Sequence, residues 1–149
     1  MKNFLILVFI GVLFIILAQV NVFACTCVDL GDPLKDKVAW WLKGSTAAFS
    51  GETIKLEKIA GTREMIATFS VDEFWKGDLS TIVEVKTPID GASCGYDFRI
   101  GTAYLVYASK VSDTLVTGLC GGNRRRYEAV GEGQINILGK GKVPEKKKL

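Results

Sequence analysis

Cysteines are the residues of this chain whose type and spacing bear most directly on chemistry. Cys25 and Cys27 lie two positions apart, and Cys94 and Cys120 follow much later in the 149-residue sequence. Histidine, a frequent catalytic base and zinc ligand, does not occur. An even number of cysteines in a small exported chain predicts disulfides, here two, and a metal site is the alternative interpretation. Three pairings are open, and we expect Cys25 and Cys27 each to link the terminus to a distant part of the chain.

Adjacent carboxylates at Asp72 and Glu73 are the other candidate for chemistry. A pair of carboxylates can act as general acid and base when both face one site. These two are expected at the end of a strand, where neighbouring side chains point to opposite faces, so a solvated surface is the preferred interpretation. The sequence also offers no phosphate-binding glycine loop and no cluster of metal ligands. We therefore disfavour an enzyme and expect no catalytic residues, no cofactor and no metal of its own.

The first 24 residues have the features of a secretory signal peptide. Lys2 is their only charged residue, and the segment from Phe4 to Ala18 contains no polar side chain. Val22 and Ala24 suit the third and last positions before a signal-peptidase cut. The apolar run is shorter than the ~20 residues of a spanning helix. We predict a signal peptide over residues 1–24 and a secreted protein that begins at Cys25, with an uncleaved anchor in the cell envelope as the alternative.

Charge is distributed unevenly along the chain, whose formal net charge is +3. Lys2 contributes one positive charge, and the segment 140–149 contributes four through five lysines and one glutamate. The body between them is therefore slightly acidic, which excludes a basic nucleic-acid-binding protein. We expect a solvated, weakly ordered basic tail. Membrane contact is expected only through the signal or a lipid anchor, or weakly through this tail.

One helix precedes the strands in the predicted order of elements. Asp32 suits the N-cap and Pro33 the first helical position, and Gly44 suits the end. Between them an apolar stripe has helical spacing, at Leu34, Val38, Trp41 and Leu42. Trp40 and Trp41 are interpreted as packing residues.

Strand-like patterns follow the helix and predict five strands, two of which, at 65–72 and 82–87, alternate with period two. The five lie over residues 47–59, 65–72, 82–87, 102–109 and 114–119. Gly51 interrupts the first run and indicates a bulge or a bend. Five strands with one early helix are typical of a small closed or partly open barrel such as an OB-fold. The predicted fold class is thus mainly β, a five-stranded OB-fold-like barrel with an N-terminal helix and two disulfides.

The Cys25-Thr26-Cys27-Val28 start resembles the netrin-type domain, and within it the tissue inhibitors of metalloproteinases. Members of that family begin their mature chain with Cys-x-Cys, followed by a helix and an OB barrel. Further similar stretches are Thr46-Ala47-Ala48-Phe49-Ser50-Gly51, Phe74-Trp75-Lys76-Gly77, Ser93-Cys94-Gly95, Tyr104-Leu105-Val106-Tyr107 and Leu119-Cys120. The resemblance covers one domain over residues 25–126. The glycines and lysines of residues 127–149 predict a weakly ordered basic tail, either without regular structure or partly helical. The third disulfide of the inhibitory domain and the separate C-terminal domain of animal inhibitors have no counterpart.

The resemblance also implies a disulfide pattern and a chemistry for the terminus. The family pairing gives Cys25 with Cys94 and Cys27 with Cys120. In the inhibitors, the terminal amine and the carbonyl oxygen of the first cysteine chelate the catalytic zinc of a protease. Carried over, Cys25 would bind that zinc and Thr26 would enter the protease pocket beside it. The implied partner is a zinc metalloprotease, and the implied function is secreted protein binding, most concretely metalloprotease inhibition.

Two other classes of function remain open from the sequence. One is a membrane-tethered envelope protein with a structural or binding role, and the other is a small exported enzyme. Lipoprotein processing would attach lipid to the Cys25 sulfur, which could then form no disulfide and would leave three cysteines. Phe23 also fits a lipoprotein signal less well than a small residue would. We therefore favour a free Cys25 amine.

Overall fold

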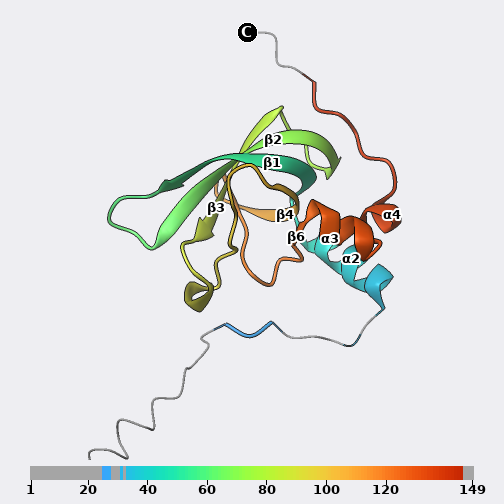
Figure 1. The fold of residues 1–149 in the computed structure, drawn as a ribbon, viewed down its shortest axis with the longest axis horizontal. Coiled ribbons are helices and arrows are strands. Elements are labelled where there is room, and N and C mark those ends of the chain that lie inside the picture. The colour runs from blue at the N-terminus through green and yellow to red at the C-terminus, as the bar shows by residue number, and fades with distance from the viewer. Residues whose placement is uncertain (1–24, 28–30, 32, 146–149) are drawn as a thin grey trace, which may run out of the picture.

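A computed structural model describes residues 25–27, 31 and 33–145 of the chain (Figure 1). The predicted signal peptide, with Val22 and Ala24, lies outside these residues, as do Asp32 and the last four residues of the basic tail. No helix within the described residues has the length and apolar composition needed to cross a membrane.

Five strands close into a barrel in the order β1–β2–β3–β5–β4, and β4 pairs back onto β1. The β3–β5 pair is parallel and the other pairs are antiparallel. This arrangement confirms the mainly β, OB-fold-like class predicted from the sequence. The barrel strands are β1 (Ala47–Lys58), β2 (Glu64–Lys76), β3 (Ile82–Pro88), β4 (Ala103–Val111) and β5 (Thr114–Val116).

The predicted irregularity at Gly51 is present in β1. The pairing register between β1 and β2 shifts between Ser50 and Gly51. A Cβ atom at Gly51 would lie 2.5 Å from the carbonyl oxygen of Ser70 and 3.0 Å from the Cα of Val71. The two strands approach each other here more closely than any side chain allows, so the position requires glycine.

The barrel interior is filled by aromatic and β-branched side chains. Phe49, Phe69, Phe98 and Tyr104 form a chain of edge-to-face contacts, with ring centroids 5.0–5.3 Å apart. Alternation along the strands supplies the other buried members of this core, which are Ala67, Val71, Phe74, Val83, Val85, Val106 and Ala108.

Three helices cover one side of the barrel and enclose a second, smaller core (Figure 1). The helices are α2 (Leu34–Gly44), α3 (Arg126–Gly131) and α4 (Gln134–Leu138). Trp41 of α2 packs against the Tyr107 ring, at a centroid distance of 5.9 Å, whereas Trp40 is 63% exposed. The buried residues of this second core are Ala48, Leu105, Tyr107 and Ala129, with Trp41, Leu42, Trp75, Ile135 and Leu138 packed against them.

The start of α2 differs from the prediction by one residue. Pro33 is the N-cap and not the first helical residue, because its ψ angle of 148° is extended. Its carbonyl oxygen accepts from the backbone N–H groups of Asp36 and Lys37. The pyrrolidine ring fixes φ but leaves ψ free, so proline can hold the N-cap position as well as the next one.

The fifth strand is shorter than predicted and ends at Val116 instead of residue 119. Thr117 turns the chain, because its hydroxyl donates to the carbonyl oxygen of Tyr107 at 2.7 Å and accepts from the Asn123 amide at 2.8 Å. The residues after it form a loop that leads to Cys120.

The segment beyond residue 126 is more structured than its composition suggested. The prediction was a weakly ordered tail over residues 127–149, at most partly helical; in the structure α3 begins at Arg126, α4 follows, and both pack on the barrel. Further on, Lys142 pairs with Phe74 of β2 through two backbone hydrogen bonds of 2.8 Å. The prediction relied on the glycine and lysine content of this segment and overlooked Ile135 and Leu138, the apolar residues of α4 that pack on the second core.

Candidate functional site

Two disulfides fasten the tripeptide Cys25-Thr26-Cys27, the start of the predicted mature chain, to the barrel. Cys25 is bonded to Cys94 and Cys27 to Cys120, which confirms the pairing implied by the family resemblance. The Cα atoms are 5.3 Å apart in both pairs, within the ordinary range for a disulfide. We call this arrangement the N-terminal clamp.

The two loops that hold the clamp contact each other directly. The backbone N–H of Leu119 donates to the carbonyl oxygen of Cys94 at 2.8 Å. A Cβ atom at Gly118 would lie 2.7 Å from that same oxygen, so glycine is needed for this approach. The two disulfides therefore attach to two loops that are in contact with each other, and the tripeptide connects these loops.

Asp90 organises the loop that carries Cys94. Its carboxylate accepts hydrogen bonds from the backbone N–H and the hydroxyl of Ser93, at 2.9 and 2.8 Å, and pairs with Arg63 at 2.8 Å. The hydrogen bonds from Arg63 and Ser93 lower the pKa of Asp90 to about 2. They fix a short 3-10 turn, Gly91–Ser93, which is followed by Cys94 at a positive φ of 65°.

Asn123 fixes the loop that carries Cys120. Its side chain is buried, and its amide oxygen accepts from the Tyr107 backbone N–H at 2.9 Å. Its amide nitrogen donates to the Thr117 hydroxyl and to the Gly118 carbonyl, at 2.8 and 3.0 Å. Asn123 thus provides an acceptor for a buried backbone N–H of β4 and also binds the loop that leads to Cys120. The barrel therefore determines the position of this loop.

The tripeptide makes few contacts of its own. Thr26 and Cys27 are exposed and Cys25 is half-buried. Among the described residues, no hydrogen bond connects residues 25–27 to the barrel, so the disulfides are their specific attachment. Their backbone N–H and C=O groups are thus available to a partner, on a segment that is nevertheless held in place.

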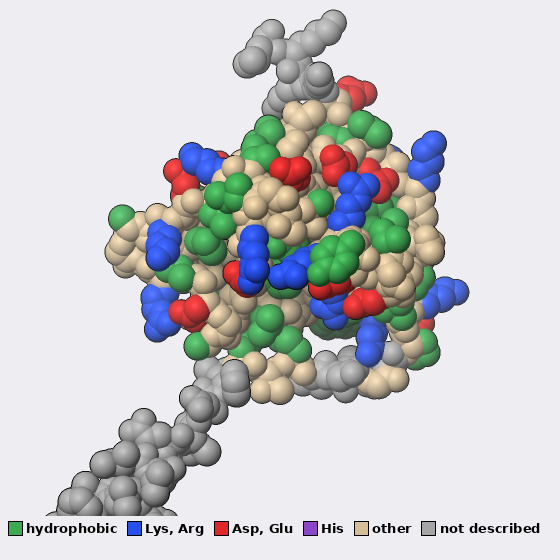
Figure 2. All heavy atoms as spheres, viewed as in Figure 1, with side chains coloured by type: hydrophobic (Ala, Val, Ile, Leu, Met, Phe, Trp, Pro, Cys, Tyr) green, Lys and Arg blue, Asp and Glu red, His purple; other side chains and the backbone are tan. Residues whose placement is uncertain are grey.

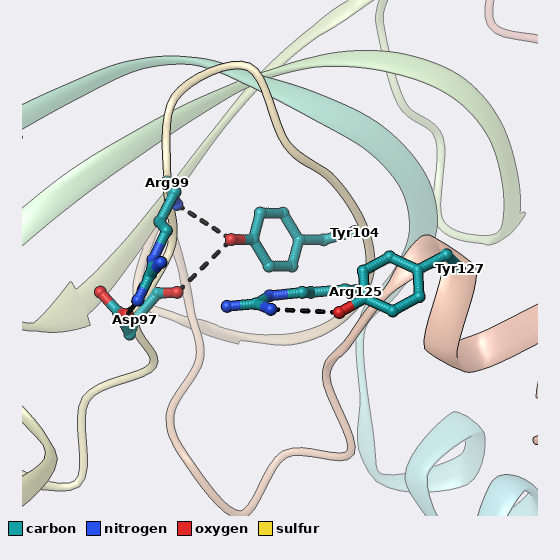
Figure 3. Close-up of polar contacts among 5 residues, drawn as sticks. All are labelled: Asp97, Arg99, Tyr104, Arg125 and Tyr127. Carbon is teal, nitrogen blue, oxygen red and sulfur yellow. Dashed lines mark hydrogen bonds and ion pairs between the residues drawn. The ribbon is translucent and has the colours of Figure 1, made fainter.

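A second polar cluster lies on the face formed by β6 (Arg124–Arg125), α3 and the loop after Cys94 (Figure 3). The buried Tyr104 pairs with Arg125 in the β4–β6 ladder. Its hydroxyl accepts from the Arg99 backbone N–H at 3.0 Å and donates to the Asp97 carbonyl at 3.4 Å. Arg125 donates to the Tyr127 hydroxyl at 3.1 Å, which raises the pKa of the Arg125 guanidinium. We call Asp97, Arg99, Arg125 and Tyr127 the arginine cluster.

No site was predicted at the run Arg124-Arg125-Arg126, which entered the sequence-based prediction only through the net charge of the body. Three successive arginines were the available signal. Their proximity to Arg99 depends on strand pairing that the sequence pattern does not reveal.

Asp72 and Glu73 do not form a joint site. Asp72 pairs with Arg126 at 2.8 Å, whereas Glu73 accepts a hydrogen bond from the Gly141 backbone N–H at 3.3 Å. Each carboxylate thus has its own structural partner, on opposite faces of β2.

Comparison with known proteins adds no further constraint. No protein-family model and no curated protein matches this sequence. Within the described part of the chain, no three side chains of the metal-binding types are grouped closely enough to hold a metal ion. The N-terminal clamp and the arginine cluster are therefore the features on which a function has to be argued.

Proposed function

We propose that this chain is an exported protein-binding domain that inhibits a zinc metalloprotease through its N-terminal clamp. The observation that carries the proposal is the clamp itself: an exposed Thr26 between two cysteines that are each bonded to a rigid barrel loop. A similar start in the netrin-type domain, and in the tissue inhibitors of metalloproteinases, supports the same function.

Zinc chelation follows from the chemistry of a free terminal amine. After cleavage behind Ala24, the amine and the carbonyl oxygen of Cys25 can close a five-membered chelate on a metal. A catalytic zinc keeps one coordination position for water, and the chelate would replace that water. Because the Cys25–Cys94 disulfide already holds the residue, little conformational entropy is lost on binding.

Thr26 would occupy the protease pocket beside the metal. Its side chain is exposed and has no hydrogen-bond partner among the described residues, so entering a pocket breaks no contact within the domain. The free backbone groups on both sides of it suit pairing with an extended segment of the protease.

A one-residue extension tests this mechanism. The mature chain starting at Cys25 is compared with a variant that carries one additional Ala before Cys25, both assayed against zinc endopeptidases. The extension removes the Cys25 amine from the chelate, and we expect inhibition to weaken by roughly 100-fold or more, equivalent to about 3 kcal/mol. A matched control carries the additional Ala at the C-terminus and should inhibit like the parent. Equal inhibition by both variants would show that chelation is not the mechanism.

The alternative is a membrane-tethered envelope protein. Lipoprotein processing needs the Cys25 sulfur, which in this structure is bonded to Cys94. This favours a free terminus over a lipidated one. Intact mass of the exported protein distinguishes the routes: the inhibitor proposal requires a chain that begins at Cys25 without acyl groups, and added lipid mass or a retained signal segment would contradict it.

A further inference from the structure

Arg125 is the arginine of the cluster that forms no ion pair among the described residues, although the negative charge of Glu128 nearby contributes to its raised pKa. The other arginines near it in the chain or in the cluster form ion pairs: Arg99 with Asp97 at 3.0 Å, Arg124 with Glu132 at 3.4 Å and Arg126 with Asp72 at 2.8 Å. The Arg125 guanidinium makes one hydrogen bond, to the Tyr127 hydroxyl, and a guanidinium has five donors in a fork that matches a carboxylate.

Arg125 is held in position rather than free on the surface. Its backbone pairs with Tyr104 in the β4–β6 ladder. The Tyr127 hydroxyl that receives its hydrogen bond donates in turn to Glu128 at 3.0 Å. These contacts restrict the side chain, so less entropy is lost when it binds a ligand.

Asp97 and Arg99 lie beside the side of the Arg125 guanidinium that does not bind Tyr127. Figure 3 shows the Arg99 and Arg125 side chains both extending toward Asp97. One Asp97 oxygen accepts from both Nε and Nη2 of Arg99, at 3.2 and 3.0 Å. The Asp97 side chain is 77% exposed, and such surface pairs are weak enough to be exchanged. A carboxylate of another molecule can therefore replace the Asp97 carboxylate at this position.

Exposed apolar side chains lie in the same chain segments as the cluster. Tyr127 is 65% exposed and Ile100, next to Arg99, is 63% exposed. Figure 2 shows lysine and arginine side chains beside hydrophobic ones near the centre of this face. Exposed tyrosine and arginine together are characteristic of the residues that dominate protein–protein binding energy.

The cluster is close enough to the N-terminal clamp for one partner to cover both. Arg99 follows Cys94 by five positions and Arg125 follows Cys120 by five, so each lies within about 18 Å of its cysteine. A standard interface buries about 800 Å² on each partner, a patch roughly 30 Å across.

We infer that the arginine cluster binds an acidic side chain of the same protein partner, which displaces Asp97 and is held by Arg99 and Arg125 against Tyr127. The shared partner rests on the proposed function, whereas the carboxylate site does not depend on it. The occupant is an Asp or Glu in an exposed segment of that protein. The site would add affinity and select partners that carry an acidic residue at this position.

An acidic peptide tests the site without the protease. The probe is an octaglutamate peptide, titrated into the isotope-labelled mature chain with the additional Ala before Cys25, so that zinc chelation plays no part. We expect amide shifts at Arg99, Arg125 and Tyr127 in heteronuclear NMR spectra, and none with octaglutamine. Arg125→Gln should weaken binding about tenfold, the effect of losing a charge-assisted pair. Asp97→Asn should strengthen binding, because it removes the competing carboxylate.

Matched variants keep the result interpretable. Lys110→Gln removes the same charge at another exposed ion pair and should leave the affinity unchanged. Arg125→Lys keeps the charge but loses the fork, and should bind more weakly than the parent. Dispersed spectra of each variant show that it is folded. Shifts elsewhere on the surface, an equal loss in Lys110→Gln, no gain in Asp97→Asn, or Arg125-dependent binding of a sulfated oligosaccharide in place of the peptide would each overturn the proposal. Peptide binding without any protease inhibition would contradict the proposed function and leave the carboxylate site standing.

Discussion

At the residue scale, the ionised form of Asp90 stabilises the loop that carries Cys94 of the clamp. Its carboxylate holds the turn that precedes Cys94, and its pKa is lowered from the ordinary value of 3.8 to about 2. A group with a lowered pKa in the folded state stabilises the fold above its unfolded pKa and loses that contribution as pH falls. For Asp90 the loss occurs between about pH 4 and pH 2.

We expect the Asp90 carboxyl to titrate near 2 in the folded protein and near 3.8 when the chain is unfolded. Arg63→Gln should raise its pKa, because the hydrogen bond from Arg63 is the largest cause of the shift. Carbon-detected NMR titration of the carboxyl gives the midpoint directly. Arg99→Gln removes the same charge from the neighbouring Asp97 pair and serves as the control. An Asp90 midpoint that does not respond to Arg63→Gln would show that another contact sets it.

At the element scale, α3 and α4 complete the second core. Ile135 and Leu138 pack on the barrel beside Tyr107, and the Trp75 indole donates to the Gly139 carbonyl at 2.8 Å. Full burial of such a side chain contributes about 1.5 kcal/mol or more, and the partly buried Ile135 and Leu138 each contribute part of that, in addition to the buried Ala129 and the contacts of Trp75. Removal of these helices should therefore lower the stability of the barrel.

We predict that a chain of residues 25–126 unfolds with a free energy lower by roughly 3 kcal/mol than a chain of residues 25–145. Urea denaturation followed by tryptophan fluorescence measures the difference. Comparison of residues 25–145 with 25–149 is the control and should give a difference within about 0.5 kcal/mol. Equal stability of the two shorter chains would mean that the domain ends at residue 126, as the sequence alone suggested.

At the scale of the whole molecule, the disulfides tie residues 25–27 to the barrel without forming part of either core. The buried residues of both cores include no cysteine. The bridges close separations of 69 and 93 positions. On the chain-entropy model each contributes roughly 4 kcal/mol, through restriction of the unfolded chain.

We expect Cys27→Ser with Cys120→Ser to lower the free energy of unfolding by roughly 4 kcal/mol, while the β-rich far-ultraviolet spectrum is retained at low denaturant. Cys25→Ser with Cys94→Ser should have a similar effect, slightly smaller because its loop is shorter. Urea titrations of both double variants and the parent provide the comparison. A loss of β structure in water would show that the barrel cannot form without the clamp.

Local patterns predicted most of the elements correctly. Period-two alternation indicated β2 and β3, and the stripe from Leu34 to Leu42 indicated α2, because each pattern repeats within one element. The errors fall where a contact distant in sequence determines the end of an element. Strand β5 stops at Val116 because Thr117 bonds to Tyr107, and α4 forms because Ile135 and Leu138 find a surface on β4 and α2.

The candidate sites also combine features that the local sequence determines with features that depend on contacts between residues distant in sequence. The sequence by itself determined the fold class and placed two cysteines at the start of the predicted mature chain, because composition and periodicity are local properties. It left three disulfide pairings open, and the pairing implied by resemblance was confirmed only in the folded chain. The tertiary structure also decided that Arg99 and Arg125 share a face, since that depends on Tyr104 pairing with Arg125 while its hydroxyl holds the loop at Arg99. Strand register and buried hydrogen bonds join segments far apart in sequence, and no local pattern specifies them.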